Sequence, residues 1–102
     1  MRGLPNLSVH QLDYLVAVHE HATWGEAAAA VGVTPSALSQ GLAELDKRLG
    51  VALFERDGRR RVPTEAASVV LDHARAVLAR TSDLARWAER RREGTLGACA
   101  WG

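Results

Sequence analysis

Three short polar side chains lie close together within VTPSALSQGLAELDKRLG, the sequence of residues 33–50. Ser36, Ser39 and Gln40 carry hydroxyl and amide groups, which can bond to the edges of DNA bases in a major groove. At about 100° per residue these three side chains share one face of a helix with the small Ala43. Because this face has no bulky group, it can approach another surface closely.

The helix that carries these side chains has clear start and stop signals. Thr34 is a good N-cap, and Pro35 follows where its missing N–H costs nothing. Gly50 is the expected C-terminal stop. A narrow apolar stripe predicts the buried side, and it is formed by Leu38, Leu42, Leu45 and Leu49. An ordinary amphipathic surface helix is the alternative, because such helices are common in soluble proteins.

Two further helices are expected before this one. Ser8 can cap a helix that runs to about His21. Thr23 and Glu26 have the spacing of a capping box, which predicts a second, short helix that Gly32 ends. Two helices joined by so tight a turn, the second with an N-cap and a polar exposed face, are typical of a helix-turn-helix. This pattern favours a DNA-binding helix over an ordinary amphipathic surface helix.

The only compact basic patch lies in VALFERDGRRRVP, residues 51–63. Asp57 with Gly58 is a strong hairpin signal, so we expect a two-stranded wing with a basic tip. Its cations are Arg56, Arg59, Arg60 and Arg61. Beside a helix-turn-helix such a hairpin can bind the phosphate backbone, with an affinity that depends on salt. A solvated surface loop is the alternative.

A long helix is expected from Glu65 to about Glu93, with Thr64 as its cap and Gly94 as its stop. Small and apolar residues recur along it at heptad spacing, a pattern typical of a helix that pairs with another helix. This predicted dimer seam comprises Val70, Ala74, Val77, Thr81, Leu84 and Ala88. At about 1.5 Å per residue the helix is roughly 43 Å long, more than a small domain covers. Trp87 lies off the seam.

The composition fits one small globular domain, with 102 residues of which 47% are hydrophobic. The net charge is +1, but residues 51–64 carry four cations against two acids. No apolar run is long enough for a membrane span and no signal peptide is evident, so we expect a cytoplasmic, nucleoid-associated protein without a membrane. Cys99 is the only cysteine, which excludes an internal disulfide.

Other kinds of site have little support. His10, His19, His21, His73 and Cys99 lack the spacing of a metal site, so no metal is expected. The sequence contains no nucleophile elbow, no glycine-rich phosphate loop and no paired catalytic carboxylates, so no catalytic residue and no enzyme are expected. The remaining alternative is a protein-interaction module that works through the helix 64–93, with weak or no DNA binding.

Taken together, these residues resemble the N-terminal DNA-binding region of a LysR-type transcriptional regulator. The similarity runs from about Leu7 to Gly97 and rests on three segments in order, LDYLVAV, TWGEAAAAVGVTPSALSQGLAELDKRLGVALFER and RRRVPTEAA. It implies a mainly α fold, with a winged helix-turn-helix in 1–63 and a linker and dimerisation helix in 64–93. Residues 94–102 would then be a tail at the start of an effector-binding domain that this sequence lacks.

The resemblance also implies roles for single residues. Base contacts are expected from Pro35, Ser36, Ser39 and Gln40, and phosphate contacts from Thr34, Arg56, Arg59, Arg60, Arg61 and Thr64. The partner would be double-stranded DNA with an inverted repeat, bound by a homodimer that pairs through the long helix; a tetramer in a full-length protein stays open. No cofactor is expected in this chain, since a small-molecule effector would bind the absent domain. Gly41 replaces a longer polar residue and is expected to weaken its helix by about 1 kcal/mol relative to Ala.

Overall fold

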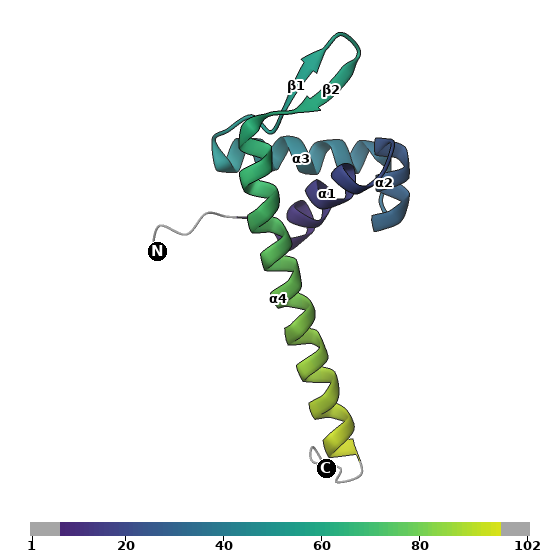
Figure 1. Ribbon diagram of the computed structural model, residues 1–102. Coiled ribbons are helices and arrows are strands. Elements are labelled where there is room, and N and C mark those ends of the chain that lie inside the picture. Colours follow the sequence, from purple (N-terminus) through teal and green to yellow (C-terminus); the bar gives the residue numbers. More distant parts are fainter. Residues whose placement is uncertain (1–6, 97–102) are drawn as a thin grey trace.

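The computed structural model describes residues 7–96 as a mainly helical protein with a small antiparallel hairpin. Its elements are α1 (Val9–Glu20), α2 (Trp24–Val31), α3 (Pro35–Leu49), β1 (Phe54–Asp57), β2 (Arg60–Pro63) and α4 (Glu65–Leu96). Figure 1 shows α1, α2 and α3 gathered into a compact body, with the hairpin at one end of the molecule and α4 extending past the body at the other. The predicted winged helix-turn-helix with a long final helix is therefore confirmed.

Hydroxyl side chains begin the helices, as the sequence predicts. The side chains of Thr34 and Thr23 accept the backbone N–H groups of Ala37 and Glu26, both at 3.0 Å. The expected return bond, from the backbone N–H of Thr23 to the Glu26 carboxylate, does not form, and Glu26 is exposed. A complete capping box forms instead at Ser8, whose backbone N–H donates to the Gln11 side chain at 3.2 Å.

Glycines in the left-handed conformation end the second and third helices. Gly32 has φ 77° and Gly50 has φ 74°, values that only glycine adopts without strain. The tight turn between α2 and α3 depends on Gly32, since Thr34 must already be extended to cap the next helix. The predicted ends of these two helices, at Gly32 and Gly50, are therefore confirmed.

The hydrophobic core lies where α1 meets the other helices. Helix α1 contacts α2, α3 and α4, and its Leu15 is fully buried. From α3, Leu38, Leu42 and Leu45 are buried and Leu49 is half-buried, so the predicted stripe faces the core. Replacing a buried leucine of this kind with alanine costs about 2–5 kcal/mol.

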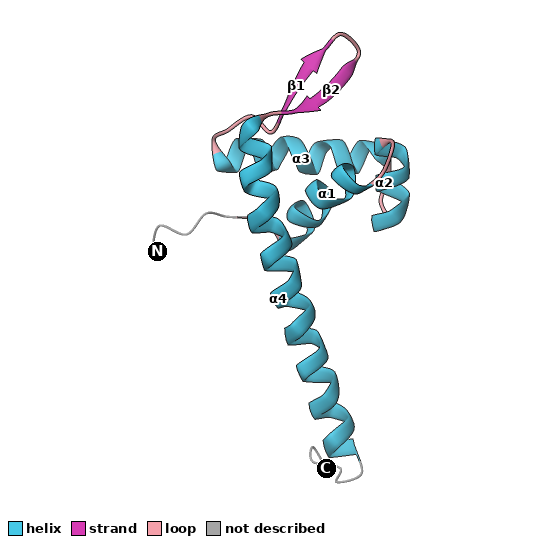
Figure 2. Ribbon diagram, in the orientation of Figure 1, coloured by secondary structure: helices cyan, strands magenta, loops and turns pink. Residues whose placement is uncertain are grey.

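The wing is the two-stranded antiparallel hairpin that the sequence predicts. Its two strands lie side by side (Figure 2) and pair antiparallel. Phe54 lies opposite Pro63, and Asp57 lies opposite Arg60. Leu53, one residue before β1, is fully buried and accepts the backbone N–H of Thr64 at 3.0 Å. This anchor fixes the base of the wing to the start of α4.

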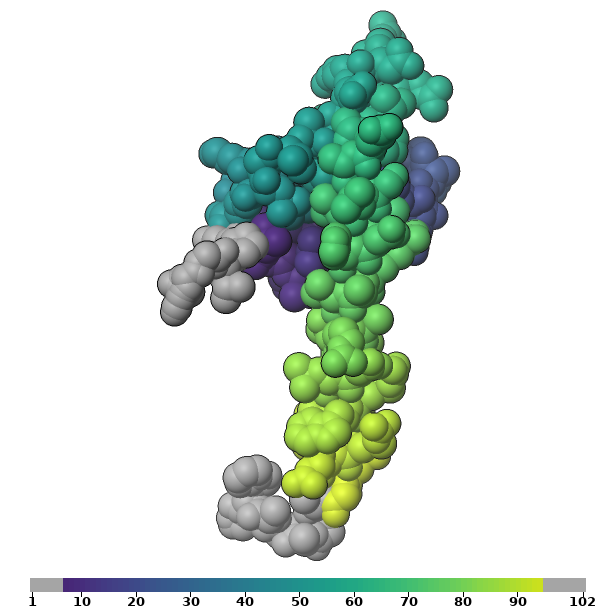
Figure 3. Space-filling model, turned by 60° about the vertical axis from the view of Figure 1, so that its left-hand side comes forward, coloured from purple at the N-terminus to yellow at the C-terminus, as the bar shows by residue number. Residues whose placement is uncertain are grey.

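Helix α4 is long and partly uncovered. Its 32 residues span about 48 Å at 1.5 Å per residue, and Figure 3 shows its second half standing clear of the body. The first half packs against the core through Ala67 and Ala74, which are both fully buried. The prediction that Gly94 ends this helix is wrong, because the helix continues to Leu96. One glycine costs a helix only about 1 kcal/mol.

Some expectations fall outside residues 7–96. Most of the predicted tail, residues 97–102, and Cys99 with it, lies outside the described residues. Among the helices that are described, none combines the length and the apolar character needed to cross a lipid bilayer.

Candidate nucleic-acid interface

An open groove runs between the N-terminal end of α3 and strand β2 of the wing. Pro35, Ser36 and Ser39 lie on the helix side, and three wing arginines lie opposite. The complete lining is Val18, Ala22, Thr23, Trp24, Pro35, Ser36, Ser39, Arg59, Arg60 and Arg61. The fold thus brings together residues that are at least 20 positions apart in the sequence and that were predicted separately to contact bases and phosphates.

The helix side of the groove offers free hydrogen-bonding groups. Pro35 and Ser36 are exposed in the first turn of α3, where unpaired backbone N–H groups and the helix dipole favour an anion. Thr34 is exposed beside them, and its hydroxyl already accepts one of these N–H groups. Gln40 is also exposed on α3 but does not line the groove.

One wing arginine is held against both helices of the helix-turn-helix. Nη1 of Arg61 donates a hydrogen bond to Oγ of Ser39 at 3.3 Å. The guanidinium carbon of Arg61 also lies 4.4 Å from the ring centroid of Trp24, a cation–π contact. Arg61 therefore connects β2, α2 and α3, whereas the sequence predicted only a phosphate contact for it.

Trp24 is the residue at this site that sequence reasoning missed. Its ring meets the Phe54 ring edge-on, with centroids 5.2 Å apart, and the Phe54 ring lies 5.9 Å from that of His19. These contacts join α1, α2 and the base of the wing in one aromatic cluster. The sequence did contain a signal. Trp24 directly follows the N-cap Thr23, and it is the only aromatic residue in the short alanine-rich helix that begins there.

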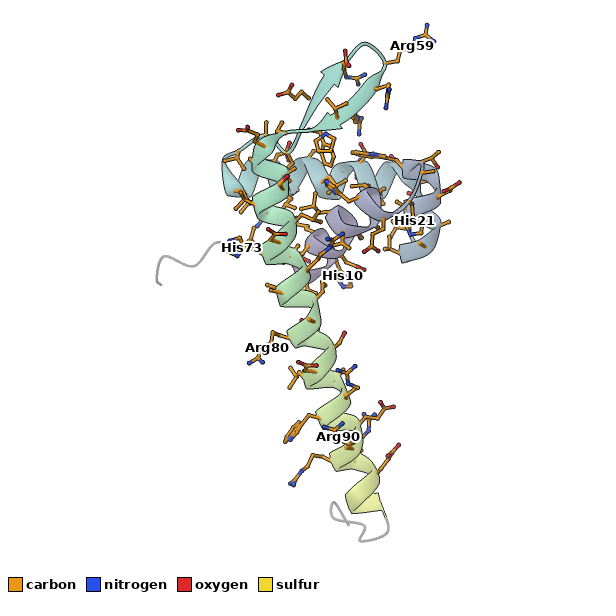
Figure 4. The ribbon with its side chains drawn as sticks, viewed as in Figure 1. His10, His21, Arg59, His73, Arg80 and Arg90 are labelled. Carbon is orange, nitrogen blue, oxygen red and sulfur yellow. The ribbon has the colours of Figure 1, made fainter. Side chains whose placement is uncertain are left out.

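The other wing arginines point into different surroundings. Figure 4 shows Arg59 at the tip of the hairpin, extending away from the helices. Arg60 lies opposite Asp57, and Arg56 lies opposite Arg61. Two cations directly opposite each other repel, and a bound anion relieves that repulsion. Arg56 lines a smaller cleft beside α3 rather than the groove.

Thr64 has a different environment from the one expected of a phosphate contact. Its hydroxyl donates to the backbone oxygen of Ala52 at 2.7 Å and accepts the backbone N–H of Ala67 at 3.3 Å. The side chain is half-buried. These bonds attach the start of α4 to the segment that leads into the wing, so the structure gives Thr64 a positioning role.

The smaller cleft contains a carboxyl group that the sequence did not single out. Asp46, near the C-terminal end of α3, lines this cleft with Arg56, and its Oδ1 atom is buried without a hydrogen-bond partner. Burial raises the pKa of the Asp46 carboxyl above its ordinary value of 3.8, and a hydrogen bond with the backbone of Leu53 offsets part of the rise. Asp46 thereby connects α3 to the residue that anchors the wing.

The histidines do not come together. His10, His21 and His73 lie on separate parts of the molecule in Figure 4. Across residues 7–96 no group of three or more His, Cys, Asp or Glu side chains could hold a metal ion.

The three-helix body, the capped polar helix and the adjacent basic hairpin define a winged helix-turn-helix. Residues 9–68 match the model of the lysR family of bacterial regulatory helix-turn-helix proteins. The chain belongs to this family, as the resemblance implied.

The relatives agree with this assignment. The chain is 52% identical over 67 residues to the probable hydrogen peroxide-inducible genes activator of Mycobacterium xenopi, covering 66% of this chain and 35% of that protein. Full-length OxyR from Pseudomonas aeruginosa, in a variant form, superimposes with a TM-score of 0.78 at 26% identity, over 83% of this chain and 29% of that one. The chain therefore spans about a third of the length of these relatives.

A DNA complex gives the same fold. The BenM DNA-binding domain bound to catB site 1 DNA superimposes with a TM-score of 0.76 at 25% identity, covering 86% of this chain and 95% of that one. Because the match extends over nearly all of a DNA-binding domain, residues 9–68 of this chain form such a domain, followed by its long helix.

Proposed function

We propose that the chain binds double-stranded DNA sequence-specifically as a homodimer and regulates transcription. The observation that carries this proposal is the groove in which the hydroxyl groups of α3 face the wing arginines. Helix α3 would enter the major groove, where hydroxyl and amide groups bond to base edges. The wing would follow the adjacent phosphate backbone. As a DNA-binding regulator the protein would work in the cytoplasm, at the nucleoid.

The residues divide into two sets. Base contacts would come from Pro35, Ser36, Ser39 and Gln40. Phosphate contacts would come from Thr34 at the helix N-terminus and from Arg56, Arg59 and Arg60 on the wing. The first set determines sequence preference, and the second supplies affinity that is independent of sequence. Thr64 and Arg61 were also predicted to contact phosphate, but we assign them supporting roles, because their side chains already make contacts within the chain.

The second copy of this chain would pair with it along the uncovered side of α4. Val77 is 39% exposed and Leu84 is 64% exposed, large fractions for apolar side chains, and Trp87 nearby is 55% exposed. Val77, Thr81 and Leu84 line one shallow surface. Ala74 is fully buried in its own domain, so we remove it from the predicted seam. Two copies related by a two-fold axis would bind two half-sites about 34–36 Å apart, or a multiple of this, in an inverted repeat.

The test is selection of binding sites from randomised duplexes, followed by affinity measurements at 50 and 200 mM salt. Enrichment of an inverted repeat, with affinity that falls steeply as salt rises, is the expected result. A folded protein that enriches no sequence and shows no salt-dependent binding contradicts the proposal. That result would favour the alternative, an interaction module that works through α4.

A further inference from the structure

We propose that Arg61 is a positioning residue that determines which bases Ser39 can bind. The inference rests on the proposed function, because it requires Ser39 to face DNA. It starts from the contact in which the Arg61 guanidinium donates to the Ser39 hydroxyl at 3.3 Å while it lies on the Trp24 ring.

The environment of Arg61 differs from that of its neighbours on the wing. All four wing arginines lie within the described residues, and among them only the side chain of Arg61 makes a hydrogen bond or a ring contact. A guanidinium on an aromatic face is held by electrostatic attraction and by the flat contact between the two groups. Trp24 in turn packs against Phe54 at the base of the wing. The orientation of Arg61 toward Ser39 is therefore fixed from two sides before DNA arrives.

This contact changes the hydrogen-bonding character of Ser39. A free hydroxyl can donate or accept, so an unmodified serine discriminates poorly between base edges. Here the oxygen of Ser39 accepts from a cation, which repels a second donor at the same oxygen. The hydroxyl hydrogen remains available to point into the groove that Ser39 lines. Ser39 should therefore prefer an acceptor, such as purine N7, guanine O6 or thymine O4, over the amino groups of cytosine and adenine.

The experiment uses the same randomised duplexes with four single variants and one double variant of the full chain. Ser39→Ala first identifies the base pair whose preference depends on the hydroxyl. At that base pair the wild type should favour acceptor edges, and Arg61→Met should reduce the preference about two- to tenfold, the range expected for one hydrogen bond. Arg61→Lys keeps a charged donor and should retain part of the preference. Arg60→Ala is the matched control, since it removes a wing cation that does not contact Ser39.

The combined variant separates a specific effect from general damage to the wing. In the Ser39→Ala background, Arg61→Met should leave base preference unchanged, because the hydroxyl it orients is gone. If Arg61→Met weakens every duplex equally, as Arg60→Ala should, the inference is wrong and Arg61 only supplies charge. Failure of the wild type to enrich any sequence would instead contradict the proposed function itself. Thermal unfolding of each variant confirms that the comparison is made between folded proteins.

Discussion

The ring of Tyr14 lies directly against the backbone of Gly41, so that a Cβ atom at Gly41 would come within 2.6 Å of Cε2 of Tyr14. Tyr14 belongs to α1 and Gly41 to α3, and this contact lets the two helices approach closely. Gly41 is half-buried, on the side of α3 that faces α1. Packing against Tyr14 therefore explains why residue 41 is a glycine. A longer polar residue, which the family resemblance implies at this position, would not fit beside this tyrosine.

Gly41→Ala should destabilise the fold although alanine is the better helix former. The overpacking costs about 1–3 kcal/mol, and the gain in helix propensity returns about 1 kcal/mol. We expect a net loss of up to about 2 kcal/mol in the free energy of unfolding, measured by urea denaturation. Gly25→Ala is the matched control, because its new Cβ would meet only the Thr23 hydroxyl at an ordinary 3.8 Å. In a Tyr14→Ala background the Gly41→Ala change should become neutral or stabilising; an unchanged loss there would show that Tyr14 is not the cause.

Asp46 should make stability depend on pH in a particular direction. Its pKa is raised in the folded state, chiefly by burial, so the folded protein binds more protons than the unfolded chain between pH 3.8 and the raised value. The free energy of unfolding therefore falls as pH rises through that window. Above the window the charged Asp46 carboxylate destabilises the folded protein to its full extent. The Asp46→Asn variant does not titrate there. The free energy of unfolding of wild type minus that of Asp46→Asn should thus decrease with rising pH across the window.

A second substitution at the same position tests the contact with the wing anchor. Asp46→Ala removes the acceptor for the backbone N–H of Leu53, and a buried donor without a partner costs about 1–3 kcal/mol. Asp46→Ala should therefore be less stable than Asp46→Asn at every pH. A stability difference between wild type and Asp46→Asn that grows with pH would mean that the pKa is lowered, contrary to the burial argument.

Gln40→Ala should change the sequence preference of the protein. Gln40 is exposed on α3, and a glutamine amide can bond in two places to adenine in the major groove. Losing such a contact relaxes discrimination at one base pair by about 1–3 kcal/mol. Affinities for the selected site, for single-base variants of that site and for random duplexes give the comparison. Equal losses on specific and random DNA would remove Gln40 from the base-contacting residues.

Arg60→Ala should act on all sequences alike. A wing cation that contacts a phosphate displaces a counterion, so its removal lowers the slope of log affinity against log salt by about 1. Arg90→Ala is the control, since Arg90 lies on α4 far from the wing (Figure 4) and should leave that slope unchanged. If both variants reduce the slope equally, the wing has no special role in phosphate contact.

The sequence predicted what depends on neighbouring residues and missed what depends on packing. The caps at Thr23 and Thr34 and the stop at Gly50 follow from local hydrogen bonds and backbone conformation, so the ends of α2 and α3 could be predicted directly. The contact of Trp24 with Arg61 joins residues 37 positions apart, and no local pattern specifies it. The phosphate contact that the resemblance implies for Thr64 stays a prediction, and no local pattern indicates the bonds that its hydroxyl makes within the protein.

The predicted dimer seam also shows that a local pattern does not reveal packing. Heptad spacing assigns Ala74 and Leu84 to the same stripe along α4. Spacing alone cannot tell which turns of the helix the chain's own domain covers. The structure buries Ala74 and leaves Leu84 64% exposed. The apolar surface open to a second copy is therefore restricted to the part of the seam from Val77 onward, with Trp87 beside it.

Leu84→Glu should weaken pairing between two copies of the chain. A carboxylate on each helix would lie in the shared apolar surface, where it loses solvation and faces its symmetry mate. Sedimentation equilibrium should show a shift from dimer to monomer, while the unfolding free energy per chain at low concentration changes little. Binding to an inverted repeat should then fall toward the affinity for a single half-site.

Ala79→Glu provides the matched control for this change. Ala79 is exposed on α4, and at about 100° per residue it lies on the face opposite Val70 and the rest of the seam. It adds the same charge to the same helix, so the dimer and the inverted-repeat affinity should be preserved. If both glutamates dissociate the dimer equally, net charge and not the seam explains the effect. If neither does, the two copies pair through another surface, and the part of α4 from Val77 to Leu84 is left for a different partner.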